Sequence, residues 1–204
     1  MRYDTKNMSL FWLKHAAAMD VPRDHLKLFY REIESMIKRV PPETNEQYEM
    51  YVDETCDFIE ESLAISFLIC QRAITSIISE AMRIPDSQFS TKSKKLRGKQ
   101  NLRDFLLNLK DEIPNEPAYS VAVCINAMAN YYKHKSEWGH KLNKQQAETA
   151  NIVTDLVGDS MNSTGVFRAA ARRLGCGDNY DPRVLGTHLV NWHKNILKLL
   201  EGST

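Results

Sequence analysis

Residues 63–78 read LAISFLICQRAITSII, a run that is apolar on almost every side of a helix. The run lies within a longer segment, about residues 43–84, that contains neither Gly nor Pro and could form one very long helix. A membrane span needs roughly 20 consecutive apolar residues, and Gln71 and Arg72 interrupt this run too early. We therefore expect the central helix of a bundle, covered on most sides by other helices, and no membrane segment.

The rest of the chain predicts an all-α multi-helix bundle built on this long central helix, with shorter C-terminal helices. All eight glycines occur from Gly98 onward, so the long helices belong to the first half of the chain. No alternating apolar run bounded by turn residues indicates a strand. Ser163 or Thr164 is expected to cap one late helix, and Gly175 to end it. The expected helices cover about residues 8–19, 20–40, 43–84, 101–112, 118–138, 144–161, 165–174 and 182–200.

Length and composition limit the domain organisation and the class of function. The 204 residues suit a helical bundle over 1–160 with a C-terminal helical extension over 161–204 packed on it, or one single domain over 1–204. The 27 basic and 26 acidic side chains leave no global charge that draws the protein to nucleic acid or membrane. No signal peptide is visible, and the four cysteines fit no metal or redox spacing. We expect a cytoplasmic protein with reduced thiols and no cofactor.

Residues 126–138, NAMANYYKHKSEW, hold the polar side chains best suited to a site. Asn126, Asn130 and His134 are spaced i, i+4 and i+8, so a helix places them on one face. Asn is a poor helix-interior residue, and two of them beside His134 could serve as donors to a phosphate or a base edge. The structural alternative is an amphipathic helix with His134 hydrogen-bonded at its C-terminal end, where a cation is favourable.

The segment Ala129-Asn130-Tyr-Tyr-Lys133-His134 resembles the motif of the HEPN superfamily, small helical-bundle domains of many toxin–antitoxin and anti-phage defence systems. The resemblance covers about residues 45–160. It implies an RNA-directed protein that forms a homodimer and cuts RNA without a metal. His134 would move a proton between the ribose 2′-hydroxyl and the phosphoester, and Asn130 stands at the second position of the motif.

The chain departs from this motif at Ala129, where active members have the Arg that stabilises the charge gathering on phosphorus. Lys133 could supply a point charge, though without bidentate geometry, and Arg72 could reach the site from the central helix. Alternatively Arg72 lies at the surface or meets an acid on a neighbouring helix. Without such a replacement the chain is a non-catalytic member that binds RNA, a nucleotide, or a protein partner such as an antitoxin.

A local basic patch, whose six cations are interrupted by no acid, precedes the motif. Such a patch can hold phosphates, and the alternative is a solvated connector. Its members are Lys92, Lys94, Lys95, Arg97, Lys99 and Arg103.

Three other sequence patterns bear on function. The spacing of His134, Glu137 and His140 spreads these side chains around a helix, so it does not predict a metal site. The acidic segment 43–61, with eight acids and no base, could dock a protein partner. Residues 163–200 resemble a helix-turn-helix DNA-binding unit, with Arg168 and Arg172 available, but the linker after Gly175 is longer than those turns use.

Overall fold

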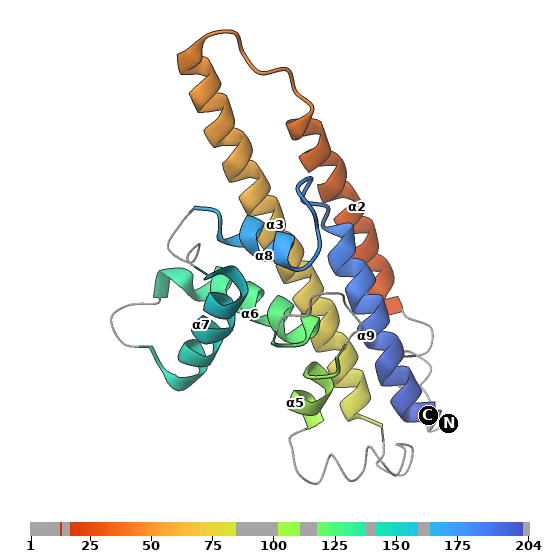
Figure 1. Cartoon of the computed structure of the whole chain (residues 1–204). Helices are drawn as coiled ribbons and strands as arrows, with labels where there is room; N and C mark the ends of the chain where they lie inside the picture. The colour runs from red at the N-terminus through yellow and green to blue at the C-terminus, as the bar shows by residue number, and fades with distance from the viewer. Residues whose placement is uncertain are drawn as a thin grey trace.

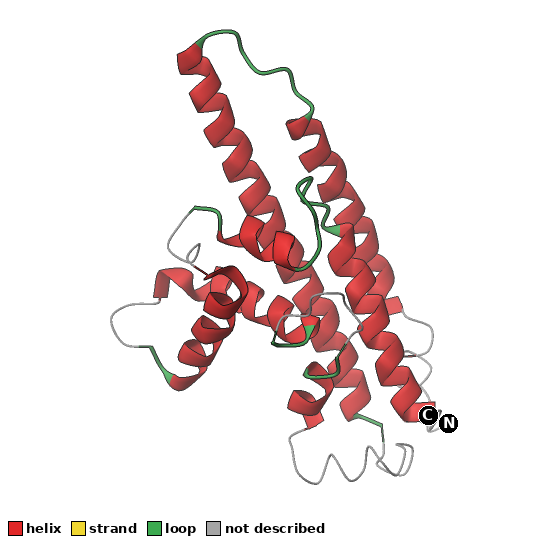
Figure 2. Ribbon diagram, in the orientation of Figure 1, coloured by secondary structure: helices red, strands yellow, loops and turns green. Residues whose placement is uncertain are grey.

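The computed structural model describes residues 13, 17–84, 102–110, 118–137, 142–158 and 164–201. In these ranges the chain is all-α, with seven α-helices, one 3₁₀ turn and no strand (Figure 2), which confirms the predicted fold class. The helix expected over residues 8–19 lies almost entirely outside the described residues. The elements are α2 (Ala17–Ile37), α3 (Asn45–Met82), α5 (Leu102–Leu107), α6 (Val121–His134), η2 (Lys135–Glu137), α7 (Lys144–Val157), α8 (Val166–Arg173) and α9 (Arg183–Glu201).

The predicted central helix is present as α3, whose 38 residues run the length of the molecule (Figure 1). From Leu63 onward one broad face of α3 is buried, with Leu63, Phe67 and Ile74 at most 1% exposed. By length and composition α3 is the one helix among the described residues that could cross a membrane, but 61% of its most apolar window is buried inside the protein. Arg72 is exposed, as the surface alternative predicted, so α3 is not covered on every side.

Helices α2 and α9 cover one side of α3 and join the two ends of the chain in one core. Leu26 and Ile33 of α2 and Leu189 of α9 are at most 1% exposed in the same hydrophobic cluster as α3. On α9 the indole N–H of Trp192 donates to the carbonyl oxygen of Leu106 over 2.8 Å. Helix α9 therefore shares one core with α2 and α3 and is bonded to the end of α5.

The outer ends of α2 and α3 extend beyond the rest of the bundle (Figure 1). We call residues 35–50 the outer hairpin. Its side chains are largely exposed, including the apolar ones of Val40 at 91% and Met50 at 59%. The hydroxyl of Tyr51 on α3 donates to the carbonyl oxygens of Met36 and Arg39, each over 3.1 Å. These bonds hold the start of α3 to the end of α2.

The start of α8 differs from the prediction that Ser163 or Thr164 caps it. The N-cap residue is Gly165, which has no side chain, and Ser163 lies outside the described residues. The carboxylate of Glu60, on α3, accepts the backbone N–H groups of Phe167 over 2.7 Å and Arg168 over 3.1 Å. A side chain more than a hundred positions away therefore satisfies the open N–H groups of this helix.

Helix α8 ends where the sequence predicted, just before Gly175. Gly175 has φ +86°, a left-handed conformation that side chains with a Cβ rarely adopt. Its N–H donates to the carbonyl oxygen of Arg172, and the N–H of Cys176 donates to that of Ala171. These two bonds form a Schellman motif, which ends α8 and turns the chain toward α9.

Candidate functional site

The polar face of α6 carries Asn126, Asn130 and His134. The two asparagines lie against α3, and His134 is open to solvent. Ser120 caps α6 by accepting the N–H of Val123, and the buried face of the helix then packs on α3. This packing places Asn126 and Asn130 beside Gln71, a side chain that is only 9% exposed. Gln71 donates from Nε2 to Oδ1 of Asn126 over 2.9 Å and to Oδ1 of Asn130 over 2.8 Å. The two asparagines thus have a structural role between helices.

Lys133 sets the direction of these bonds. Its Nζ donates to Oε1 of Gln71 over 2.8 Å, and because an ammonium group only donates, the oxygen of Gln71 must face it. The nitrogen of Gln71 then faces the asparagines, which accept through Oδ1 and turn their Nδ2 groups away. Within the described part of the chain neither Nδ2 group has an acceptor. We call Gln71, Asn126, Asn130 and Lys133 the amide cluster.

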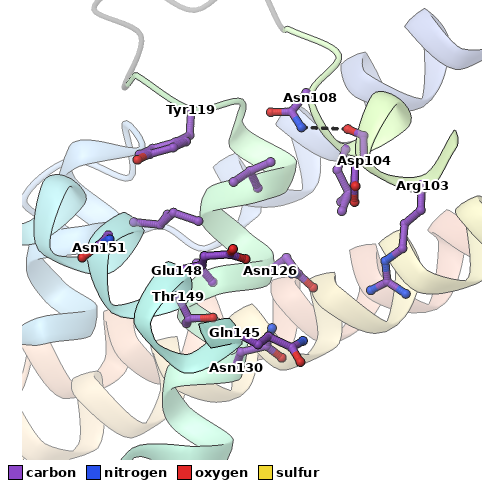
Figure 3. Close-up of a pocket in the computed structure, with 14 residues that line it drawn as sticks. Arg103, Asp104, Asn108, Tyr119, Asn126, Asn130, Gln145, Glu148, Thr149 and Asn151 are labelled. Carbon is purple, nitrogen blue, oxygen red and sulfur yellow. Dashed lines mark hydrogen bonds between the residues drawn. The ribbon is translucent and has the colours of Figure 1, made fainter. Parts of the chain in front are cut away.

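The same two asparagines line a pocket of about 530 Å³ between α5, α6 and α7 (Figure 3). Leu107, Val123, Ala127 and Ile152 give it an apolar part. One cation, Arg103, stands with two acids, Asp104 and Glu148, so the charges nearly balance. A cavity of this kind suits a polar ligand that carries many hydrogen-bonding groups and little charge. Five side-chain amides line it, those of Asn108, Asn126, Asn130, Gln145 and Asn151.

A second pocket, of about 200 Å³, contains His134 and Glu137. It shares Asn130, Gln145 and Thr149 with the larger pocket, so we call the two together the α6–α7 groove. The start of α7 is fixed beside it by reciprocal bonds. Oδ1 of Asn143 accepts the N–H of Gln146 over 2.9 Å, and Oε1 of Gln146 accepts that of Asn143 over 3.0 Å.

His134 stands open in this groove, with a side chain that is 46% exposed. Its Nδ1 lies 2.9 Å from Oε2 of Glu137, one helical turn later. Because an ionised carboxylate only accepts, Nδ1 carries the proton of the neutral ring and Nε2 has the free lone pair. Glu137 therefore selects the tautomer and orients the ring, the arrangement that a histidine base requires.

The other residues named from the sequence lie elsewhere or are already engaged. Ala129, at the position of the expected Arg, is fully buried in the core. Lys133 is bonded to Gln71, and Arg72 lines neither part of the groove. The candidates Lys94, Lys95 and Arg97 lie outside the described residues. Arg103, the last cation of the basic patch, does line the larger pocket.

Among the described residues no metal site was found, and three of the four cysteine thiols are buried. No group of three or more His, Cys, Asp or Glu side chains in them could hold a metal ion. Burial raises the pKa of the Cys124 and Cys176 thiols to about 12, so both are protonated and unreactive at neutral pH. Cys70 is likewise buried, and its pKa is raised for the same reason.

Several residues of the amide cluster and of the groove were not predicted as site residues. In the sequence Gln71 only interrupts an apolar run, and its partners on α6 lie more than fifty positions away. Glu137 follows His134 at i+3, a spacing that would have indicated the pair. Gln145 and Thr149 have no such signal, because only the packing of α7 on α6 brings them to the groove.

Comparison with protein-family models, curated proteins and solved structures finds no match for this chain. The resemblance to the HEPN superfamily therefore stays a prediction that rests on residues 129–134.

Proposed function

We propose that this chain is a HEPN-like, RNA-directed protein of a toxin–antitoxin or anti-phage defence system, and that it binds single-stranded RNA in the α6–α7 groove. In this proposal His134 is the proton-transfer group of a metal-independent ribonuclease. The single observation that carries the proposal is the open imidazole of His134, oriented by Glu137 at one end of an amide-lined groove.

The lining of the groove supports an unpaired base as the ligand. Amide side chains pair with base edges, and the Nδ2 groups of Asn126 and Asn130 present two donors one helical turn apart. Apolar walls such as Val123 and Ile152 can cover the face of a base. Since Arg103 is opposed by Asp104 and Glu148, base contacts rather than phosphate contacts would supply most of the affinity.

The chemistry follows from the tautomer of His134. Nε2 accepts the proton of a ribose 2′-hydroxyl, and the 2′-oxygen attacks the adjacent phosphorus. The bond from phosphorus to the 5′-oxygen breaks, that oxygen takes up the proton that Nε2 has accepted, and the products are a 2′,3′-cyclic phosphate and a 5′-hydroxyl. Glu137 stabilises the imidazolium that forms. The missing guanidinium at Ala129 leaves the charge on phosphorus to amide N–H groups or to a cation from a second copy in a homodimer.

The test uses a labelled single-stranded RNA in the presence of a chelator. Cleavage by the wild-type protein should end in a cyclic phosphate and disappear in His134→Ala. Glu137→Gln should retain part of the activity, because the amide can still accept from Nδ1. His25→Ala, which removes an exposed histidine of α2, is the matched control and should cleave normally. RNA that stays intact with the wild-type dimer would contradict the nuclease.

A second candidate is a non-catalytic interaction module that binds RNA or a protein partner. The burial of Ala129 favours it, because no side chain at this position can take the place of the catalytic Arg. RNA that is bound but not cut, with binding weakened by Asn130→Asp, would support this candidate over the nuclease. The substitution keeps an oxygen toward Gln71 and replaces the free donor by an acceptor.

A further inference from the structure

A third pocket, of about 360 Å³, shares no lining residue with the α6–α7 groove. It lies where the middle of α3 meets the end of α6 and the start of α8. Three carboxylates and two aromatic rings line it, together with one lysine, Thr164 and Val166. The residues that define it are Asp57, Glu60, Glu61, Tyr131, Lys135 and Phe167, and we call it the anionic aromatic pocket.

The aromatic rings of this pocket belong to a packed cluster. The ring centroids of Tyr131 and Phe167 are 5.9 Å apart, and Tyr132 meets Phe167 edge-on at 5.8 Å. Phe167 is 2% exposed and holds the cluster against the core. Aromatic faces carry negative charge density that attracts cations, and of the two lining rings the half-buried Tyr131 is the one that a ligand can reach.

The carboxylates leave negative charge open to a ligand. Glu60 is already used, since it caps α8 and lies 3.4 Å from Nε of Arg168. Asp57 is exposed, and no partner is found for it among the described residues. Glu61 is exposed and accepts only the hydroxyl of Tyr132 in the described part of the chain. Two exposed carboxylates thus stand beside the rings.

The cations near this pocket offset only part of its negative charge. Arg168 is held by Glu60 and by Sγ of Cys56, which lies 2.9 Å from its Nη1. Lys135, on the rim, has its Nζ 5.5 Å from the centroid of the Tyr132 ring. The Tyr132 ring, which packs on Phe167 beside the pocket, thus already has an ammonium group as a cation–π partner.

The charge continues from the pocket along α3. Exposed acids recur every three or four residues toward the outer hairpin, and no Lys or Arg lies between positions 43 and 61. Such a face repels RNA, so it cannot be an extension of the α6–α7 groove. The exposed acids of this row are Glu46, Glu49, Asp53, Asp57 and Glu61.

We infer that the anionic aromatic pocket binds the guanidinium of an arginine in a basic segment of a protein partner, and that neighbouring cations of this segment lie along the acidic row of α3. Arginine fits better than lysine because its planar group stacks on aromatic rings and binds carboxylates in a bidentate manner. The acidic row supplies charge complementarity over several turns, and the pocket supplies the specific anchor.

The probe for this inference is a fluorescein-labelled hexa-arginine peptide, titrated with the full-length protein by fluorescence anisotropy. Asp57→Asn/Glu61→Gln removes two charges inside the pocket. Glu46→Gln/Glu49→Gln removes the same charge from the same helix outside the pocket. We expect the pocket variant to weaken binding about tenfold and the matched control about twofold. A hexa-lysine peptide should bind more weakly than hexa-arginine.

Equal losses of affinity in the two double variants would mean that the peptide responds only to the net charge of α3. This result would overturn the inference that the pocket binds arginine. Failure of hexa-arginine to bind the wild-type protein would also overturn it. Both double variants change only exposed side chains, so circular dichroism should show unchanged helix content. None of these outcomes depends on whether the α6–α7 groove binds or cuts RNA.

Discussion

The ammonium group of Lys133 on α6 lies 2.8 Å from the side-chain oxygen of Gln71 on α3. This contact determines which end of the Gln71 amide faces Asn126 and Asn130, and so which of their atoms remain available to the groove. The packing of two helices and the polarity of the candidate site therefore depend on the same side chain.

Replacement of Gln71 tests this dependence. Gln71→Leu leaves the Oδ1 atoms of Asn126 and Asn130 without a donor in a half-buried place, so we expect the free energy of unfolding to fall by about 2 kcal/mol. Arg72→Gln, at the adjacent exposed position, should change it by less than about 0.5 kcal/mol. Urea unfolding followed by circular dichroism measures both, and equal values for the two variants would contradict the assigned role of Gln71.

We expect the side chain of Glu60 to contribute more to the free energy of unfolding than the exposed acids of α3. Glu60→Ala removes the cap of α8 and leaves the guanidinium of Arg168, 21% exposed, without its carboxylate. We expect a loss of about 2 to 3 kcal/mol in the free energy of unfolding. Asp57→Ala, one turn earlier on the same helix and exposed, should cost less than about 0.5 kcal/mol. A small effect of Glu60→Ala would show that α8 needs no cap from α3.

Two histidines of α9 should make the protein sensitive to acid. Burial lowers the pKa of His188 and of His193, because the charged ring loses its solvent. Their stabilising contribution is complete above the ordinary histidine pKa of about 6.5, since both rings are then neutral in the folded and unfolded chains. Below it the unfolded chain binds protons that the folded protein does not, so the free energy of unfolding falls as the pH decreases toward the lower folded values.

The measurement is urea unfolding at about pH 7.5 and about pH 5.5, on either side of the ordinary histidine pKa. His188→Gln/His193→Gln should show a smaller decrease between the two pH values than the wild type, whatever its absolute stability. His25→Gln, at an exposed site on α2, should keep the wild-type decrease. An unchanged decrease in the double variant would assign the acid sensitivity to other groups.

Binding of RNA in the α6–α7 groove should depend only weakly on salt. With Arg103 as the cation that lines it, opposed by Asp104 and Glu148, the groove can neutralise about one phosphate at most, so the slope of log K against log salt should lie between about 0 and −1 for a single strand. Filter binding over a range of KCl concentrations measures this slope. A slope steeper than about −3 would mean that other cations, such as those of the basic patch, carry the binding.

The architecture could be predicted from the sequence because the helix signals are local. The absence of Gly and Pro over 43–84 predicted α3, and Gly175 marked the end of α8 by its left-handed conformation. Segment 118–138 contains α6 and η2, although the α-helix itself is shorter. The ends differ by a few residues because capping contacts, such as that of Ser120 with Val123, decide the last turn.

The site could be predicted only in part, because its contacts join distant positions. The i, i+4, i+8 spacing placed Asn126, Asn130 and His134 together on α6, but not the partner that two of them use. In the sequence Gln71 is an interruption of an apolar run, and Glu60 is one of eight acids in segment 43–61. Only the packing of α6 and α8 on α3 brings Gln71 to the side chains of Asn126 and Asn130, and Glu60 to the backbone N–H groups at the start of α8.

The outer hairpin has a consequence for how the molecule opens. Residues 35–50 have little buried apolar surface, and Tyr51 supplies side-chain contacts that hold the two helix ends together. Amide protons there should exchange with solvent deuterium at a lower opening free energy than those around Phe67, and a protease should cut this end before it cuts the helices around Phe67. A partner that binds along α3 would slow both processes, so protection of this end against deuteration is a direct signal of docking.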